Sequence, residues 1–307
     1  IRAGGWLQTD QAAVTRDRKA LLLGLTAVLL WSTVATAFKL ALREFDVFQL
    51  VAYAVLVSAV ALLLLVVKQG KLALLKEYAR DHLSFYLVLA LLNPLLYYLV
   101  LLRAYDLLPA QQAQPINYTW AITLALLAVP LLGQKLSVRD VLAIVMGYGG
   151  VVIIATRGQL LEMQFDSLEG VILALASTVL WALYWLLSTR NPRDPVASLC
   201  LNFLLAAPCA LIICATFSTL VLPSLRGAMA AAWIGLFEMG VTFALWSTAL
   251  RLASAVARIG NLIFLSPLIS LVLIASVLGE VIHPATLVGL ALILPALLLQ
   301  QTQPAKV

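Results

Sequence analysis

Apolar residues gather into ten stretches along the chain, and nearly every charged residue lies in the short segments between them. Each stretch is about 20 residues long, the length that a helix needs to cross a hydrocarbon core about 30 Å thick. The period-two alternation of a membrane β-barrel is absent from these stretches. Because a backbone in lipid must satisfy its own hydrogen bonds, each stretch predicts a helix. The predicted spans are 20–38, 48–67, 83–102, 113–132, 139–156, 170–188, 196–217, 229–250, 259–278 and 284–301.

The composition agrees with this pattern. Hydrophobic residues make up 63% of the chain, charged residues make up 11%, and the mean hydropathy is +1.03. About a quarter of the residues of a soluble domain are charged, so a soluble domain is excluded. The sequence therefore predicts an all-α polytopic membrane protein with ten transmembrane helices.

Lysine and arginine are distributed unevenly between the predicted loops. If the N-terminus is cytoplasmic, 15 of the 20 basic residues lie on the cytoplasmic side. These are Arg2, Arg16, Arg18, Lys19, Lys68, Lys71, Lys76, Arg80, Lys135, Arg139, Arg190, Arg193, Arg251, Arg258 and Lys306. The other side has Lys39, Arg43, Arg103, Arg157 and Arg226. The positive-inside rule then predicts that both termini are cytoplasmic. The net charge of +6 is a topology signal, and no soluble basic face indicates nucleic-acid binding.

The two halves of the chain contain similar short motifs. Trp31-Ser32 in the first span corresponds to Trp181-Ala182 in the sixth, and the turn Leu132-Gly133-Gln134-Lys135 corresponds to Leu278-Gly279-Glu280-Val281. Five spans are an odd number, so the second half would enter the membrane from the opposite side. Inverted repeats of this kind are typical of secondary transporters, whose substrate site lies between the halves. The predicted division is an N-terminal arm 1–19, a first repeat 20–156, a linker 157–169, a second repeat 170–301 and a tail 302–307.

Several motifs resemble a known family. The segment 24–33 resembles the opening span of the drug/metabolite transporter superfamily, and most closely that of its YddG-like amino acid exporters. The segment 117–120 with the turn at 132–135 resembles their fourth span, and 240–246 resembles their eighth. Ser266-Pro267-Leu268 with the turn at 278–280 is similar to the repeat signature of the EamA domain. The resemblance covers about residues 20–300. It implies two inverted five-helix repeats around a central cavity, alternating access, and export of aromatic and other amino acids.

Two features depart from the pattern of those exporters and widen the expected substrate range. The third span contains Asn93-Pro94 and Tyr97-Tyr98, and Pro94 predicts a kink in the helix. The eighth span contains Glu238, with Thr242 and Trp246 at four-residue intervals on one predicted helix face. A carboxyl group in a span binds a proton or a substrate ammonium, or it forms a structural hydrogen bond to a neighbouring helix.

Other polar and aromatic residues in the spans are also candidates for a cavity, because lipid tolerates polar groups poorly. Amide groups near the start of the fourth span can bind both ends of a zwitterion, and the alternative for this region is an interfacial belt. Aromatic rings in the sixth span can form the apolar walls of a cavity, and the alternative for them is ordinary packing. The complete candidate set is Asn93, Tyr97, Tyr98, Asn117, Tyr118, Trp120, Trp181, Tyr184, Glu238, Thr242 and Trp246. Gln111, Gln112 and Gln114 belong to the same amide-rich entry, and Lys39 and Arg103 are predicted as interfacial anchors.

The sequence thus predicts a multi-pass inner-membrane transporter that exports amino acids and related metabolites. The alternative within the superfamily is a transporter of drugs or quaternary amines. A phosphate-binding loop, a nucleophile motif and histidines at metal spacing are all absent from the sequence, so neither enzyme activity nor a cofactor is expected. A channel would require a filter or a ring of like residues, and none is visible. The glycines Gly147, Gly149, Gly150 and Gly289 predict close helix contacts, within a monomer or at a homodimer edge.

Overall fold

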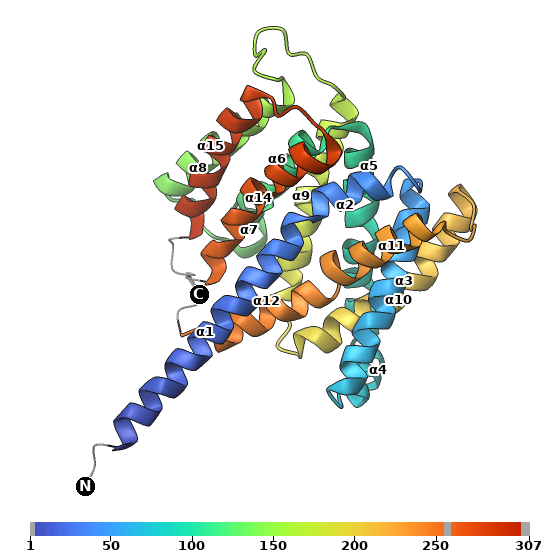
Figure 1. The fold of residues 1–307 in the computed structure, drawn as a ribbon, viewed down its shortest axis with the longest axis vertical. Coiled ribbons are helices and arrows are strands. Elements are labelled where there is room, and N and C mark those ends of the chain that lie inside the picture. Colours follow the sequence, from blue (N-terminus) through green and yellow to red (C-terminus); the bar gives the residue numbers. More distant parts are fainter. Residues whose placement is uncertain (1–3, 255–258, 302–307) are drawn as a thin grey trace.

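The structure is a computed structural model that describes residues 4–254 and 259–301, and every regular element in these ranges is helical (Figure 1). The tail 302–307 and Arg258 lie outside the described residues. The elements are α1 (Gly4–Ser32), α2 (Val34–Ala41), α3 (Val47–Lys68), α4 (Leu72–Ala90), η1 (Leu91–Leu96), α5 (Tyr97–Leu107), α6 (Ala110–Tyr118), α7 (Trp120–Leu132), α8 (Val138–Ala155), α9 (Leu168–Ser188), α10 (Pro195–Phe217), α11 (Leu225–Trp233), η2 (Ile234–Glu238), α12 (Val241–Leu252), η3 (Asn261–Phe264), α14 (Leu265–Leu273), η4 (Ile274–Leu278) and α15 (Pro284–Gln301).

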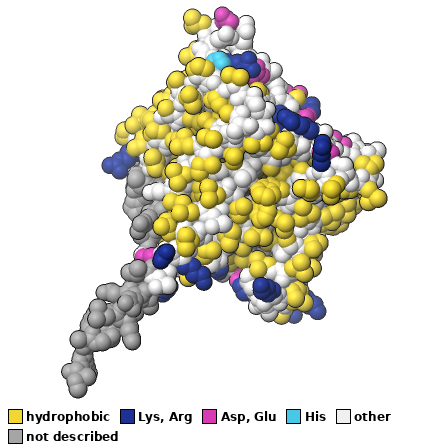
Figure 2. Space-filling view, viewed as in Figure 1, with side chains coloured by type: hydrophobic (Ala, Val, Ile, Leu, Met, Phe, Trp, Pro, Cys, Tyr) yellow, Lys and Arg dark blue, Asp and Glu magenta, His cyan; other side chains and the backbone are white. Residues whose placement is uncertain are grey.

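Nine helical segments within the described residues are long and apolar enough to cross a membrane. The last predicted span corresponds to an apolar helix over Pro284–Gln300 that is shorter than the others. Large apolar side chains such as Leu22, Leu64 and Val145 are more than half exposed. Figure 2 shows an apolar face whose charged side chains lie mainly toward its edges. A surface of this kind fits an integral membrane protein, because lipid replaces water as its solvent.

Two of the long helical segments are interrupted near their middle by irregular backbone, one at the kink that Pro94 predicted and one in a span that was predicted to be continuous. Between α4 and α5, Asn93 has an extended backbone (φ −145°, ψ 118°) inside the π-helical segment η1. Pro94 lacks an N–H and its ring clashes with the preceding turn, which accounts for this interruption. Between η2 and α12, Gly240 has φ −118° and ψ −91°. A side chain at Gly240 would lie 2.9 Å from the carbonyl oxygen of Gly235, so the close approach favours glycine.

The helices pack in pairs that are distant in sequence: α8 with α15, α3 with α10, α1 with α12, and α5 with α9. At the α8–α15 contact, a Cβ atom placed on Gly150 would lie 2.6 Å from the carbonyl oxygen of Gly289. Small residues therefore let these two backbones meet within one chain, which is one of the two alternatives that the sequence left open.

Successive long helices run in alternating directions, so the bundle has two ends. The N-terminal end contains the start of α1 and the turns 69–71, 133–137 and 189–194. The opposite end contains the connections 42–46, 108–109, 156–167, 218–224 and 279–283. Figure 1 shows the connection after α8 at the top, far from the start of α1.

Candidate functional site

Aromatic side chains from five helices form a connected network in the interior. We call it the aromatic cluster; its members are Trp31 of α1, Tyr97 of α5, Trp120 of α7, Trp181, Tyr184 and Trp185 of α9, and Phe243 and Trp246 of α12. Five of these residues were predicted as cavity residues from the sequence. The structure brings them together from both halves of the chain.

The rings at the centre of the cluster are stacked. Trp181 lies 4.6 Å from Tyr97 and 5.7 Å from Tyr184 between ring centroids, with interplanar angles of 28° and 29°. Trp120 and Trp185 stack at 6.2 Å with an angle of 14°. These separations lie within the 4.5–7 Å range of favourable aromatic pairs. The faces of the rings therefore stabilise one another, and the edges remain available to a bound group.

The cluster continues into α12 and α1 through residues outside the predicted set. Phe243 stacks on Trp185 at 5.8 Å and lies 6.1 Å from Trp31. Trp31 in turn lies 5.5 Å from Trp246. The sequence contained a signal for two of them: Phe243 falls within the family-like segment 240–246, and Trp185 lies one helical turn after Trp181 in the sixth predicted span. Only the tertiary structure shows that Phe243 connects α9 to α1.

A chain of hydrogen bonds connects the cluster to the polar start of the α6–α7 segment. The Tyr97 hydroxyl donates to Asn117 Oδ1 at 3.3 Å, and Asn117 Nδ2 donates to Ser177 Oγ of α9 at 2.9 Å. Nearby, the Tyr118 hydroxyl donates to Ser266 Oγ of α14 at 2.8 Å. Buried polar groups need such partners, so these bonds fix the positions of Asn117 and Tyr118. Ser177 and Ser266 were not predicted, because a lone serine in a span has no distinctive sequence signal.

Glu238 lies at the end of η2, beside the interruption before Gly240. Its Oε1 accepts a hydrogen bond from the Tyr98 hydroxyl at 3.1 Å, across 140 positions of sequence. No lysine or arginine forms an ion pair with Glu238 in the ranges 4–254 and 259–301. Its second carboxylate oxygen is therefore free to accept a donor from a bound molecule. A carboxylate without a cation in the membrane interior is a typical site for a proton or an ammonium group.

The predicted shared face of Glu238, Thr242 and Trp246 is wrong. The helix is interrupted at residues 239–240, so Glu238 ends η2 while Thr242 and Trp246 belong to α12, and the three do not lie on one continuous helix. Thr242 is fully buried and donates a hydrogen bond to the carbonyl oxygen of Phe237. Trp246 packs with Trp31 beside α1. Of these three residues, Glu238 is the one whose polar group meets the third span.

The predicted set divides by accessibility. Asn93, Tyr97, Tyr98, Tyr184 and Thr242 are buried. The members that keep accessible surface are Asn117, Tyr118, Trp120, Trp181, Glu238 and Trp246. Asn93 has a buried Oδ1 with no hydrogen-bond partner among the described residues. The accessible members can contact a bound molecule, whereas the buried tyrosines support them from behind.

Several residues predicted for the cavity or for the membrane surface have structural contacts at the opposite end instead. Gln111 Nε2 donates to the carbonyl oxygen of Val281 at 2.9 Å, and Gln112 Nε2 donates to Asp166 at 2.7 Å. Lys39 is partly buried and donates to the carbonyl oxygens of Tyr105 and Leu108. Lys39 was predicted as an interfacial anchor at this end, and the carboxyl end of α5 offers it unpaired carbonyl groups that attract its charge.

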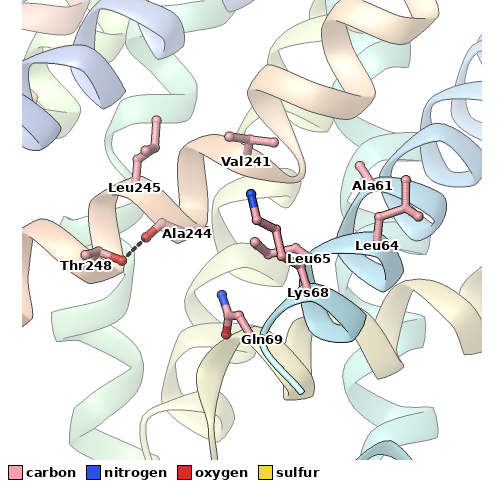
Figure 3. A pocket seen from close by; sticks show the side chains of 9 residues that line it. All are labelled: Ala61, Leu64, Leu65, Lys68, Gln69, Val241, Ala244, Leu245 and Thr248. Carbon is pink, nitrogen blue, oxygen red and sulfur yellow. Dashed lines mark hydrogen bonds between the residues drawn. The ribbon is translucent and has the colours of Figure 1, made fainter. Parts of the chain in front are cut away.

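A pocket of about 410 Å³ lies between α3 and α12, toward the N-terminal end (Figure 3). Its lining residues are Ala61, Leu64, Leu65, Lys68, Gln69, Val241, Ala244, Leu245 and Thr248. None of the predicted cavity residues belongs to this lining. The described residues contain no group of three histidine, cysteine, aspartate or glutamate side chains that could hold a metal ion.

The model of the EamA-like transporter family matches the chain twice, over residues 18–156 and 168–300. The chain belongs to the EamA-like transporter family. This confirms the resemblance that the sequence motifs indicated. The family is one of membrane transporters, so this EamA-like transporter has a small-molecule substrate. The two matches leave out the connection 157–167 between α8 and α9.

Two curated relatives are similar to this EamA-like transporter. The aromatic amino acid exporter YddG of Ancylobacter novellus (strain ATCC 8093) is 27% identical over 183 residues, which cover 58% of this chain. The matched region spans 62% of the length of that exporter. The uncharacterized transporter YvbV of Bacillus subtilis (strain 168) is also 27% identical, over 71% of this chain and 72% of its own length. At this identity the relatives support the role of a transporter at the level of the family.

A solved crystal structure has a similar fold, with a TM-score of 0.64 at 22% identity. The similarity covers 91% of this chain and 95% of the other. The arrangement of helices in this EamA-like transporter is therefore one that has been seen experimentally.

Proposed function

We propose that this EamA-like transporter is a secondary transporter that exports neutral amino acids, aromatic ones included, by alternating access. The observation that carries the proposal is Glu238, a carboxylate without a cation beside the aromatic cluster. A zwitterion with an apolar side chain needs an acceptor for its ammonium group, a donor for its carboxylate and apolar walls. Glu238 supplies the acceptor, the second N–H of the Asn117 amide supplies the donor, and the rings of Trp120 and Trp181 supply the apolar walls.

The proposal includes ten spans in two inverted five-helix repeats, over 20–156 and 170–301. The two matches to the family model support two related halves. The packing supports the inversion, because α3 with α10 and α8 with α15 join corresponding helices of opposite halves. The pairs α1 with α12 and α5 with α9 are equivalent to each other, since exchanging the two halves converts one pair into the other. The excess of lysine and arginine at the N-terminal end supports an inner-membrane orientation with both termini cytoplasmic.

In this mechanism the two halves move around the site that they share. The interruptions at Asn93-Pro94 and Met239-Gly240 lie beside the Tyr98–Glu238 hydrogen bond. Interrupted helices release backbone groups and let their two segments move separately. A substrate ammonium at Glu238 would therefore contact one mobile junction directly, and the other through Tyr98.

Transport of quaternary amines is the second candidate, and the same carboxylate favours it. Tryptophan faces attract cations, and Trp246 meets Trp31 at an angle of 60° instead of stacking on it, so Trp246 could hold an amine without a carboxylate. The two functions differ in one requirement: an amino acid needs Asn117 to bind its carboxylate, and an amine does not.

Counterflow in proteoliposomes separates the two candidates. Labelled phenylalanine, threonine and methionine are compared with a cationic dye in vesicles that contain the purified chain. We expect amino acid counterflow without dye movement, and Glu238→Gln should reduce the apparent amino acid affinity by about tenfold or more through loss of a charge-assisted bond. Glu162→Gln, in the exposed 156–167 connection, is the control. Dye counterflow without amino acid counterflow would overturn the proposal.

A further inference from the structure

The groove between α3 and α12 is closed at its inner end. Above it, η2 lies against α3: a Cβ atom on Gly235 would lie 2.6 Å from the carbonyl oxygen of Ala54, and one on Gly240 would lie 3.3 Å from Ser58 Oγ. Toward the N-terminal end the two helices separate, since α12 packs on α1 while α3 packs on α10. The pocket of about 410 Å³ fills the space that this divergence leaves. It is a blind slot with its mouth near the last turn of α3.

The walls of the slot are mostly apolar, and one basic side chain enters it. Ala61 and Leu65 form one wall, and Val241 and Leu245 form the other. Thr248 adds little polarity, because its hydroxyl donates to the carbonyl oxygen of Ala244 within the helix. The basic group at the slot is Lys68, whose side chain extends into the space between the two helices in Figure 3.

Lys68 has neither an ion pair nor a side-chain hydrogen bond with any described residue of the chain. Lys71, three positions later, differs in that its Nζ lies 2.6 Å from Asp194 Oδ2. An uncompensated ammonium group above an apolar slot complements an anion with an attached hydrocarbon. Beside it, Leu64 is 65% exposed, so the slot borders the apolar surface of the bundle.

We propose that this groove binds an anionic phospholipid, with its phosphate on Lys68 Nζ and one acyl chain between α3 and α12. The lipid comes from the leaflet at the N-terminal end of the bundle. Basic residues near a membrane surface attract anionic headgroups, and basic pockets between helices bind them specifically. This inference goes beyond the proposed function, since it concerns a different pocket and requires no particular substrate.

The composition of the groove argues against an amino acid as its occupant. A zwitterion needs an acceptor for its ammonium group, and no aspartate or glutamate lines the pocket; its one amide, Gln69, is exposed and uncharged, and so is a weaker acceptor than a carboxylate. Glu238 and the aromatic cluster, which could bind a zwitterion, lie outside its lining. A phospholipid has no such requirement: its phosphate pairs with Lys68 and its chain lies along the apolar walls.

Native mass spectrometry of the full chain tests the proposal. The purified protein in a neutral detergent is titrated with phosphatidylglycerol, and separately with phosphatidylcholine as the zwitterionic reference. We expect preferential retention of phosphatidylglycerol, and about fivefold weaker retention in Lys68→Met, from the loss of one basic residue. Lys68→Arg should retain the lipid, because it preserves the charge.

Two further variants separate the headgroup from the acyl chain. Ala244→Trp places a bulky ring in the slot and should reduce the retention of both lipids. Lys76→Met removes an exposed charge on α4, outside the groove, and should leave retention unchanged. The thermal unfolding midpoint of each variant without added lipid shows whether it is folded, and Lys68→Arg remains informative if Ala244→Trp is not.

Equal phosphatidylglycerol retention in wild type and Lys68→Met would overturn the proposal. If Lys76→Met weakened phosphatidylglycerol retention as much as Lys68→Met, the proposal would also be overturned, because the lipid would then be attracted by the charge of the whole surface. Displacement of the lipid by free phenylalanine would instead assign the groove to the substrate. Amino acid counterflow that persists when the lipid site is lost would leave the proposed function intact.

Discussion

The two ends of the bundle are held together in different ways. At the opposite end, partly buried side chains join separate elements: Glu280 accepts hydrogen bonds from the backbone N–H groups of Ala110 and Gln111 at 2.9 and 3.2 Å. At the N-terminal end, the Lys71–Asp194 ion pair joins α10 to the α3–α4 turn, on one side of the groove. Asp17 binds Ser254 on the other side, between α1 and the end of α12. Neither of these contacts bridges the groove.

The comparison shows where the bundle is closed. Two charged residues bind the helix ends on either side of the α5–α6 turn. The cation Lys39 binds the carboxyl end of α5, and the anion Glu280 binds the amino end of α6. Each charge is favourable at its helix end. Opening the opposite end would therefore break charge-assisted bonds, whereas α3 and α12 are already apart at the N-terminal end. Under the proposed alternating-access mechanism, this arrangement corresponds to a transporter closed at the opposite end.

Glu280→Ala should have the largest effect on stability. The substitution leaves the N–H groups of Ala110 and Gln111 without partners, and the loss of bonds to a charged group predicts a decrease of about 2–3 kcal/mol in the free energy of unfolding. The thermal unfolding midpoint in detergent measures it. Glu162→Ala, on an exposed connection at the same end, is the matched control. If both variants have the same unfolding midpoint as the wild type, the hydrogen bonds of Glu280 to the start of α6 contribute nothing to stability.

Lys39→Met should destabilise the same end less. It preserves the length of the side chain but removes the hydrogen bonds to the carbonyl oxygens of Tyr105 and Leu108, at 2.7 and 3.1 Å. Carbonyl groups at a helix end can recover water, so we expect a loss of about 1–2 kcal/mol. Arg43→Met, an exposed cation nearby, is the comparison. Equal midpoints for the two variants would show that Lys39 acts only as a surface charge.

Asp194 should give the N-terminal end a weak dependence on pH. Burial alone would raise the pKa of Asp194, but hydrogen bonds from Lys71 and from the N–H groups of Ala197 and Val196 outweigh burial and lower it. A lowered pKa gives stability that is complete above the unfolded value near 4 and is lost as the pH falls through the folded value.

We expect this contribution to be about 1 kcal/mol, because the ion pair is partly exposed. Unfolding midpoints measured between pH 7 and pH 3 should fall less steeply in Asp194→Asn than in the wild type. Asp106→Asn, at the opposite end, is the control. Parallel curves for wild type and Asp194→Asn would assign the acid sensitivity to other carboxylates.

The helices were predictable from the sequence, and one of the two interruptions was as well. Pro94 is a local signal, because proline disrupts a helix wherever it occurs in the interior. Gly240 gave no such signal, since an isolated glycine is tolerated in a helix at a modest cost. Its break depends on the approach of η2 to α3, which only the packing shows. The predicted face of Glu238 and Thr242 was wrong for this reason.

Residue type identified the candidate site only in part. Tryptophans and tyrosines in a span are conspicuous, and six of the eight members of the aromatic cluster were recognised as predicted residues or as a repeat counterpart. Phe243 was not, because phenylalanine in a span is ordinary. The glutamines were conspicuous too, yet Gln111 and Gln112 bond at the opposite end, because composition indicates that a buried polar group needs a partner but not which partner it has.

The sequence by itself determined the class of this protein, the positions of its helices and its membership of a transporter family. These follow from the length of the apolar stretches and the motifs between them, which are local properties of the chain. The tertiary structure alone decided that Tyr98 meets Glu238, that Lys39 and Glu280 close one end, and that α3 and α12 separate at the other. These contacts join residues that are up to 170 positions apart, and they arise from small residues and buried hydrogen bonds that fit only when the helices pack.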